Sequence, residues 1–178
     1  MTYFTADLHL GHEGIIRFCD RPFDSVSEMD KALILNWNSR VTDRDDIYIL
    51  GDLFHKNKEN AEDVLKRLKG RKHLVIGNHD GWLRDIDAEK YFVEVDKMID
   101  LKMDGIEMTL CHYPLLSWPH MHHGGYCIFG HIHNNKEETG WPFIQTNPLL
   151  LNAGVDVNWF SPVLFSELQE NNRLFKES

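Results

Sequence analysis

Short apolar runs alternate with amphipathic segments along the first half of the chain. Residues 3–6, 47–50 and 73–76 form apolar runs of the length expected for buried strands. Amphipathic helices are predicted between them, one opening near residue 25 and the other over residues 58–69. The order strand–helix–strand–helix–strand is typical of a parallel sheet with right-handed crossovers, so we expect an α/β fold.

The first of these helices carries start and packing signals. Ser25 and Glu28 have the spacing of a capping box, which satisfies the free backbone N–H groups at a helix start. Met29, Leu33 and Trp37 follow at four-residue spacing and form one apolar stripe. We interpret this stripe as part of the hydrophobic core and not as a cofactor site.

The pattern changes after residue 80, where the apolar segments become shorter. The turn pair Asp104-Gly105 between two such segments predicts a β-hairpin. The predicted elements of this half are a short helix at residues 82–89, strands at residues 92–95, 98–102, 106–111, 126–129 and 149–155, and a C-terminal helix opening at Ser166. The chain has no repeat, low-complexity tract or linker, so we expect residues 1–178 to form a single domain built from two sheets.

Composition and charge narrow the class of protein. The chain is 42% hydrophobic and 26% charged, as in a soluble globular protein, and it has neither a transmembrane run nor the basic region of a signal peptide. A net charge of −9 disfavours stable binding to nucleic acid. Cys19, Cys111 and Cys127 match no zinc spacing, so we expect reduced thiols in a cytoplasmic protein.

Polar side chains that can bind a metal or transfer a proton follow five of the predicted strands. In the clearest case, Gly77-Asn78-His79-Asp80 comes directly after an apolar run, and the glycine allows a sharp turn. Functional side chains are commonly found at such strand ends in α/β folds. The five sets are Asp7 and His9, Asp52, Asn78 and His79, His112, and His131 and His133.

Together these side chains form a mixed nitrogen and oxygen donor set without thiolate. Such a set suits Mn, Fe, Co, Ni or Zn in a catalytic site, but not a structural zinc. Seven candidate ligands exceed what one ion with an open position can use, so we expect two ions that share a bridging carboxylate. Three nearby side chains, His12, Arg17 and His55, are expected either to contact a substrate phosphate or to lie in solvated loops.

The ordered pattern Asp-x-His, Gly-Asp, Gly-Asn-His-Asp, His, Gly-His-x-His, running from Asp7 to His133, resembles the calcineurin-like metallophosphoesterases. The segment around residues 152–163 is also similar to small bacterial and phage members of that family. The resemblance implies a four-layer α/β/β/α sandwich of two mixed β-sheets flanked by helices, with the site at the sheet edge. Every motif position matches the family pattern.

The resemblance also implies a role for each residue. The first metal would be held by Asp7, His9, Asp52 and His133, and the second by Asp52, Asn78, His112 and His131, with Asp52 as the bridge. His79 would face the substrate as a catalytic residue, and Asp80 would orient its imidazole. The implied cofactors are two divalent transition-metal ions, with manganese the first expectation and iron, nickel, cobalt or zinc the alternatives.

Elementary chemistry agrees with these roles. A shared carboxylate offsets the repulsion between two cations about 3.5–4 Å apart, and a water between them is acidified to hydroxide near neutral pH. A histidine with an ordinary pKa of about 6.5 can protonate the leaving oxygen. We therefore expect a hydrolase that cleaves a small phosphodiester or phosphomonoester, with a nucleotide as one candidate, by hydroxide attack with inversion at phosphorus.

Two other functions are weighed against this one. A non-catalytic binding scaffold on the same fold would be expected to have lost the motif histidine or several ligands, and all are present here. A nuclease acting on nucleic-acid ends would be expected to carry additional DNA-binding regions and a basic surface, and this short acidic chain shows neither.

Overall fold

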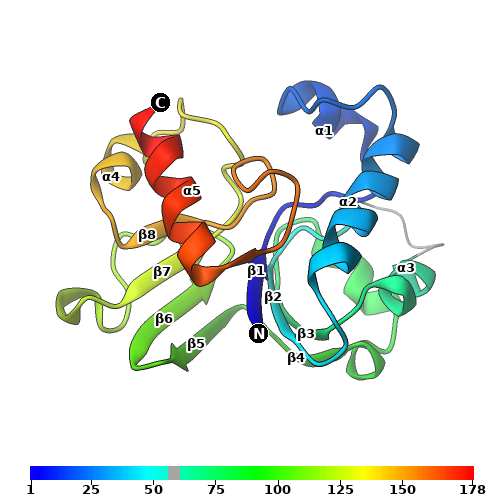
Figure 1. Cartoon of the computed structure of the whole chain (residues 1–178), viewed down its shortest axis with the longest axis horizontal. Helices are drawn as coiled ribbons and strands as arrows, with labels where there is room; N and C mark the ends of the chain where they lie inside the picture. The colour runs from blue at the N-terminus through cyan, green and yellow to red at the C-terminus, as the bar shows by residue number, and fades with distance from the viewer. Residues whose placement is uncertain (56–60) are drawn as a thin grey trace.

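The computed structural model describes residues 1–55 and 61–178, and in this part of the chain two β-sheets pack face to face (Figure 1). The first sheet has the strand order β4-β3-β2-β1-β9, in which β1 to β4 are parallel and β9 is antiparallel to β1. Its strands are β1 (Thr2–Thr5), β2 (Asp46–Leu50), β3 (Arg71–Val75), β4 (Phe92–Asp96) and β9 (Val163–Leu164).

The second sheet is also mixed, with the order β5-β6-β7-β8. Its first two strands form the predicted hairpin, and β6, β7 and β8 run parallel. Its strands are β5 (Met98–Met103), β6 (Ile106–Cys111), β7 (Tyr126–Phe129) and β8 (Leu150–Asn152). The strand predicted at residues 149–155 is thus shorter than expected, since only a single bridge, from Gly154 to Ala6, continues it.

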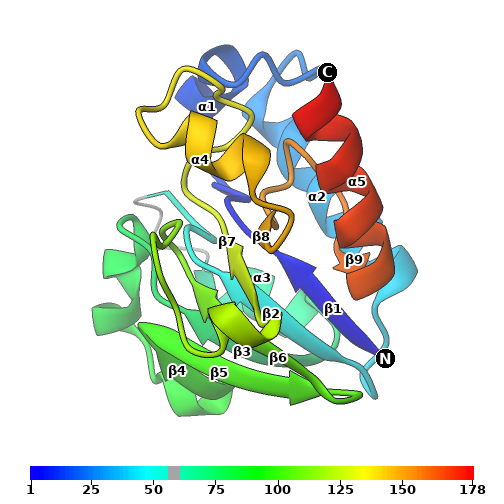
Figure 2. The same cartoon turned by 90° about the vertical axis from the view of Figure 1, so that its left-hand side faces the viewer.

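Helices cover the outer faces of both sheets. The side chains of α2 (Val26–Arg40) and α3 (Ala61–Arg67) belong to the cluster on the outer face of the first sheet, and those of α4 (Trp141–Thr146) to the cluster on the second. The C-terminal helix α5 (Phe165–Glu177) lies alongside β8, β1 and β9 (Figure 2). The four-layer α/β/β/α sandwich of two mixed sheets is therefore confirmed.

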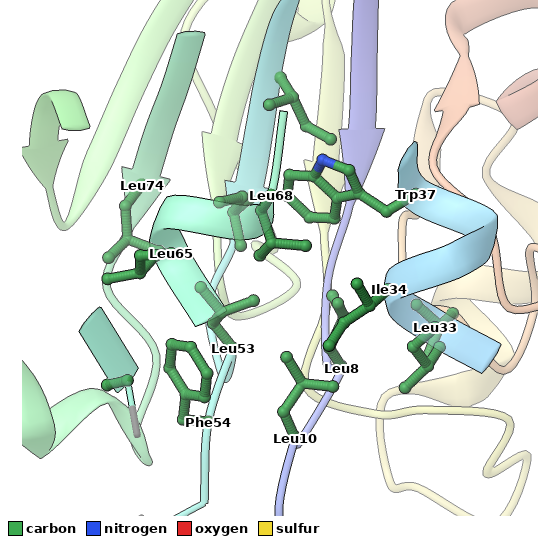
Figure 3. Packing of buried hydrophobic residues seen from close by; sticks show 14 of the residues in the cluster. Leu8, Leu10, Leu33, Ile34, Trp37, Leu53, Phe54, Leu65, Leu68 and Leu74 are labelled. Atoms are coloured by element: carbon green, nitrogen blue, oxygen red, sulfur yellow. The ribbon is translucent and has the colours of Figure 1, made fainter. Parts of the chain in front are cut away.

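The hydrophobic core is divided by the first sheet, because its central strands are buried on both faces. On β2, Ile47 and Ile49 face the helices, while Tyr48 and Leu50 face the second sheet. Figure 3 shows the helix side of this division, where Trp37 of α2 and Leu65 of α3 converge on the sheet. The apolar stripe predicted for the first helix is thus part of the core, with Met29, Leu33 and Trp37 all buried.

The start of α2 follows its sequence signal. The Ser25 hydroxyl accepts a hydrogen bond from the Glu28 backbone N–H at 3.2 Å, as expected of an N-cap. The Glu28 carboxylate reaches one residue further back than in the standard box, because it accepts from the Asp24 N–H at 2.9 Å. Both contacts satisfy backbone donors that the first helical turn leaves free.

Some element predictions are wrong in detail. The helix expected at residues 82–89 is a pair of 3₁₀ helices, η1 (Asp80–Asp85) and η2 (Ala88–Lys90). The second predicted helix corresponds to α3, and its expected start at residues 58–60 lies outside the described residues. The elements that were not predicted are α4, β9 and η3 (Met121–His123). No helix in the described ranges is long and apolar enough to cross a membrane.

Candidate metal centre

The candidate ligands follow strands whose C-terminal ends lie at one edge of the sandwich. In Figure 1, α1 (Glu13–Phe18) and α4 lie on the same side of the molecule as the end of β1. Backbone hydrogen bonds join the segments that leave the strands: Asp7 N–H donates to Gly51 at 3.0 Å and His9 N–H to Asp52 at 2.9 Å. The two sheets are joined in the same region, because the His131 N–H donates to the Asp7 carboxylate at 2.8 Å.

Five candidate ligands have left-handed backbone. Their φ angles lie between 52° and 72°, which is uncommon for residues other than glycine. These residues are Asp7, His9, Asp52, His131 and His133. A residue with this backbone conformation cannot continue a strand, so the chain turns at each of these positions just beyond a strand end.

Asp7, His9 and His133 form the first group of donors. One ligand atom from each lies within 4.8 Å of the others, and all three residues are buried. The imidazole rings of His9 and His133 have centroids 5.0 Å apart. This group brings together three of the four side chains expected at the first metal.

The second group is built around Asp52 and His112. Asp7, Asp52 and His112 place ligand atoms within 4.8 Å of one another. The side-chain oxygen of Asn78 lies 3.0 Å from His112 Nε2 and 3.0 Å from His131 Nδ1. Each of the four side chains expected at the second metal therefore lies within 3.5 Å of at least one of the others.

Asp52 lies between the two groups. Its Oδ2 atom is 3.5 Å from His9 Nε2 and 3.5 Å from His112 Nε2. Its Oδ1 atom accepts the His79 backbone N–H at 2.8 Å, which fixes the rotation of the carboxylate. One oxygen is thus held by the backbone, and the other faces an imidazole of each group.

Hydrogen bonds at the far side of two rings select the tautomer that a metal ligand needs. His112 Nδ1 donates to the Leu50 carbonyl at 2.8 Å, which leaves a lone pair on Nε2. His133 Nδ1 lies 2.8 Å from the Asp156 carboxylate, so Nδ1 carries a proton and Nε2 is the nitrogen that would give up its proton to a metal. Both Nε2 atoms belong to side chains whose ligand atoms converge on the site.

Glycines allow the segments to approach closely. A Cβ at Gly51 would lie 2.3 Å from His112 Nδ1 and 2.8 Å from the Gly77 backbone, and a Cβ at Gly77 would lie 2.2 Å from Asp52 Oδ1. At Gly130, a Cβ would lie 2.6 Å from Asp7 Oδ2. Three of the five strand ends therefore need a residue without a side chain.

The titration behaviour of these side chains reflects their burial. Burial raises the pKa of Asp7 to about 6, against the opposing effect of His133 and His112. Burial also lowers the pKa of His9, and the neighbouring His133 and Arg21 lower it further. Burial by itself would lower the pKa of His133. The hydrogen bonds to Asp156 and Cys19 outweigh this effect and raise the pKa to about 10.

Several buried polar atoms at the site have no hydrogen-bond partner among the described residues. Among them are Oδ1 of Asp7 and both ring nitrogens of His9. Leaving such atoms unpaired costs free energy, so their presence at the centre of a cluster of donors fits a bound cation. The donor set, of carboxylate, amide oxygen and imidazole, fits a divalent transition metal.

Asp80 does not have the position expected for it. Its carboxylate accepts hydrogen bonds from the backbone N–H groups of Asp52, Leu53 and Gly77 and from the Trp82 indole, at 2.8 to 3.1 Å. None of these donors is the His79 imidazole. The expectation that Asp80 orients His79 is therefore wrong, and Asp80 instead holds the backbone at the ends of β2 and β3 together.

The His79 ring lies among other histidines. Its centroid is 5.1 Å from that of His9 and 5.2 Å from that of His55. His55 in turn stacks on His12, with centroids 3.6 Å apart and planes 7° from parallel. Burial, helped by His55 and His79, lowers the pKa of His12 to about 4, so His12 is neutral near pH 7. Arg17 is exposed on α1, and no described contact connects it with this group.

A shallow hollow of about 210 Å³ opens beside the two groups. Its lining includes five candidate site residues, Asp52, Asn78, His79, His131 and His133, together with Phe18, Ile132, Asn135 and Glu138. Phe18 is 73% exposed, although it is apolar. Tyr113, 44% exposed, packs on the His131 ring at a centroid distance of 4.5 Å. Sequence patterns did not indicate Phe18 or Tyr113, because neither belongs to a periodic apolar stripe.

Comparison with known proteins identifies the family. A model of the family "calcineurin-like phosphoesterase" matches residues 2–172. The chain belongs to the calcineurin-like phosphoesterase family. The uncharacterized protein MJ1445 of Methanocaldococcus jannaschii is 37% identical over 163 residues, which cover 90% of this chain and 85% of that protein. The crystal structure of AQ665 from Aquifex aeolicus, a protein of unknown function, matches with a TM-score of 0.74 and 27% identity over 96% of this chain and 98% of that one.

The resemblance seen in the motifs is therefore confirmed. Calcineurin-like phosphoesterases typically bind divalent metals, and the present chain carries candidate clusters for them at the strand ends. Hydrolysis of phosphoesters is the activity that this family membership supports.

Proposed function

We propose that this calcineurin-like phosphoesterase hydrolyses a small phosphoester with two divalent metal ions held side by side. The position of the Asp52 carboxylate supports this most directly. Its Oδ2 atom lies at 3.5 Å from an imidazole nitrogen of each donor group, while Oδ1 is held by backbone. A carboxylate between two sets of donors is the arrangement that a dinuclear site requires.

In this proposal, the first ion is held by Asp7, His9, Asp52 and His133, and the second by Asp52, Asn78, His112 and His131. Manganese is the first candidate for both positions. Two such ions would supply an acidified water and charge neutralisation for the phosphoryl oxygens. The remaining tasks, which are to orient the ester and to protonate the leaving group, fall to residues of this chain.

His79 is proposed as the general acid. The His79 backbone N–H is hydrogen-bonded to the Asp52 carboxylate, and His79 lines the hollow beside the candidate ligands. A histidine in this position can donate a proton to a leaving alkoxide, a contribution of about 10²–10⁴ in rate. Because Asp80 is occupied by backbone donors, the ring environment of His79 is set by His9 and His55 instead.

The proposed substrate is a phosphodiester or phosphomonoester of nucleotide size, with the diester preferred. The net charge of −9 opposes long polyanions, whereas one or two phosphates can place their charge at the candidate metal groups. The exposed rings of Phe18 and Tyr113 at this site offer surfaces on which a flat base could stack.

Metal titration tests the dinuclear proposal. Wild-type protein freed of metal and titrated with Mn²⁺ should bind two equivalents, and Asp52→Asn should lower the stoichiometry and abolish hydrolysis of nitrophenyl phosphodiesters. Asp100→Asn is the matched control, because Asp100 is an exposed carboxylate on β5 that accepts a hydrogen bond from the Thr109 hydroxyl, away from the candidate ligands. A wild-type plateau at one equivalent, or a fully active Asp52→Asn protein, would overturn the proposal.

A further inference from the structure

A buried ion pair lies directly behind the first donor group. Arg21 and Asp156 are 135 residues apart in the sequence, and their side chains are 0% and 2% exposed. The guanidinium binds the carboxylate through two nitrogens, Nε at 2.7 Å from Oδ1 and Nη2 at 3.0 Å from Oδ2. This is the two-pronged geometry that only arginine provides.

The same guanidinium also holds the segment that carries Asp7 and His9. Nη2 donates to the Asp7 carbonyl at 2.8 Å and Nη1 to the Leu8 carbonyl at 2.9 Å. Nη1 further contacts the sulfur of Met29 at 3.4 Å. All five N–H donors of Arg21 are thus used, and two of them fix backbone oxygens between two residues with left-handed φ.

Asp156 connects this cation to a candidate ligand. Its Oδ2 atom accepts from His133 Nδ1 at 2.8 Å, so the metal-facing nitrogen of His133 is Nε2. The segment carrying Asp156 is itself fixed, since the buried Asn158 amide donates to the carbonyls of Asn152 and Gly154. Asn152 in turn donates to the His133 carbonyl at 2.8 Å.

Stability alone does not account for such a pair. Two charges removed from water cost several kcal/mol, and an apolar pair of similar volume is often as stabilising. The pair does, however, contact both sequence-distant parts of the first donor group: residues 7 and 8 on one side and His133 on the other. Its contacts therefore fit a role in fixing the distance between these parts.

We propose that Arg21 and Asp156 are positioning residues for the first metal, which fix the His133 tautomer and hold its imidazole at a set distance from Asp7 and His9. The inference rests on the proposed metal site, but not on the identity of the substrate or on catalysis. In the part of the chain that the structure describes, neither residue is hydrogen-bonded to Asn78, His112 or His131, the side chains that only the second metal would use.

Calorimetric titration with Mn²⁺ tests the pair in the full-length protein. Asp156→Asn and Arg21→Lys should each weaken one equivalent by about 10–100-fold and leave the other unchanged, as is usual when the hydrogen-bond partner of a metal ligand is altered. Arg40→Lys is the matched control: Arg40 pairs with Glu167 between α2 and α5, so its loss should lower the melting temperature without changing either affinity.

A second measurement needs no variant. In Zn²⁺-loaded wild-type protein, ¹⁵N NMR of the histidine rings should show His133 protonated at Nδ1, with Nε2 shifted by the metal. Protonation at Nε2 would overturn the inference, as would wild-type affinity for both equivalents in the two variants, or equal weakening of both. A metal-loaded wild-type protein that hydrolyses no phosphoester would instead overturn the proposed function and leave this inference intact.

Discussion

At the scale of single residues, the burial of Asp7 has opposite consequences with and without metal. Its raised pKa, about 6 against an ordinary value of 3.8, means that the folded metal-free protein resists ionising this carboxyl. The stability that Asp7 contributes is therefore complete below pH 4 and is lost as the pH rises through 6. A cation beside the carboxylate reverses this preference.

Replacing Asp7 by asparagine should reveal that reversal. In metal-free protein, Asp7→Asn should be more stable than wild type at pH 8, by up to roughly 2–3 kcal/mol, and about equal to it at pH 4. With Mn²⁺ present, the wild type should gain stability and the variant should gain much less. Urea unfolding gives the free energy of unfolding of both proteins, each with Mn²⁺ and with chelator. If the wild type were more stable than Asp7→Asn at pH 8 without metal, the argument would be contradicted.

His79 allows chemistry to be separated from metal binding. If it protonates the leaving group, His79→Ala should keep both metal equivalents while kcat falls by about 10²–10⁴, or roughly 3–5 kcal/mol in barrier. The loss should be smaller for esters with nitrophenolate leaving groups, which need little protonation. Loss of metal in the variant would show that His79 belongs among the ligands.

At the scale of elements, the strand ends meet closely only because glycines follow or flank them. Gly51→Ala should prevent the end of β2 from approaching β3 and β6, since the new Cβ would contact His112 Nδ1 and the Gly77 backbone, and its φ of +88° disfavours any side chain. We expect a large loss of stability and of metal binding, measured by thermal unfolding and titration. Gly81→Ala is the control, because nothing lies within 4 Å of its added Cβ.

The sequence predicted those parts of the fold in which local pattern and tertiary structure agree. Strands such as β2 are continuous apolar runs, and polar residues after them can lie only at the sheet edge. Two elements were too short to show a period: α4 has six residues and β9 has two. The roles of Asp80 and Arg21 could not be predicted either, because their partners are 2 to 135 residues away and no spacing rule connects them.

At the scale of the whole molecule, the distribution of charge bears on substrate size. The candidate metals would be the main positive centre of a chain with net charge −9, so small esters should be favoured over long ones. We expect a higher kcat/KM for nucleotide-sized diesters than for duplex oligonucleotides, with little change between low and high salt. Efficient duplex cleavage that weakens steeply with salt would contradict this, because it would require a basic binding surface.

The left-handed backbone at His9 also affects how the protein would respond to directed evolution, because both ring nitrogens of this buried histidine lack a hydrogen-bond partner among the described residues. A side chain in this conformation costs about 1–2 kcal/mol relative to glycine, and without metal the His9 ring makes no hydrogen bond that offsets this cost. A library selected for heat resistance in the presence of chelator should therefore replace His9, with glycine favoured by the backbone, and should keep His133, which is hydrogen-bonded to Asp156. The same selection performed with metal present should keep His9 as well, because its imidazole would then bind the first metal.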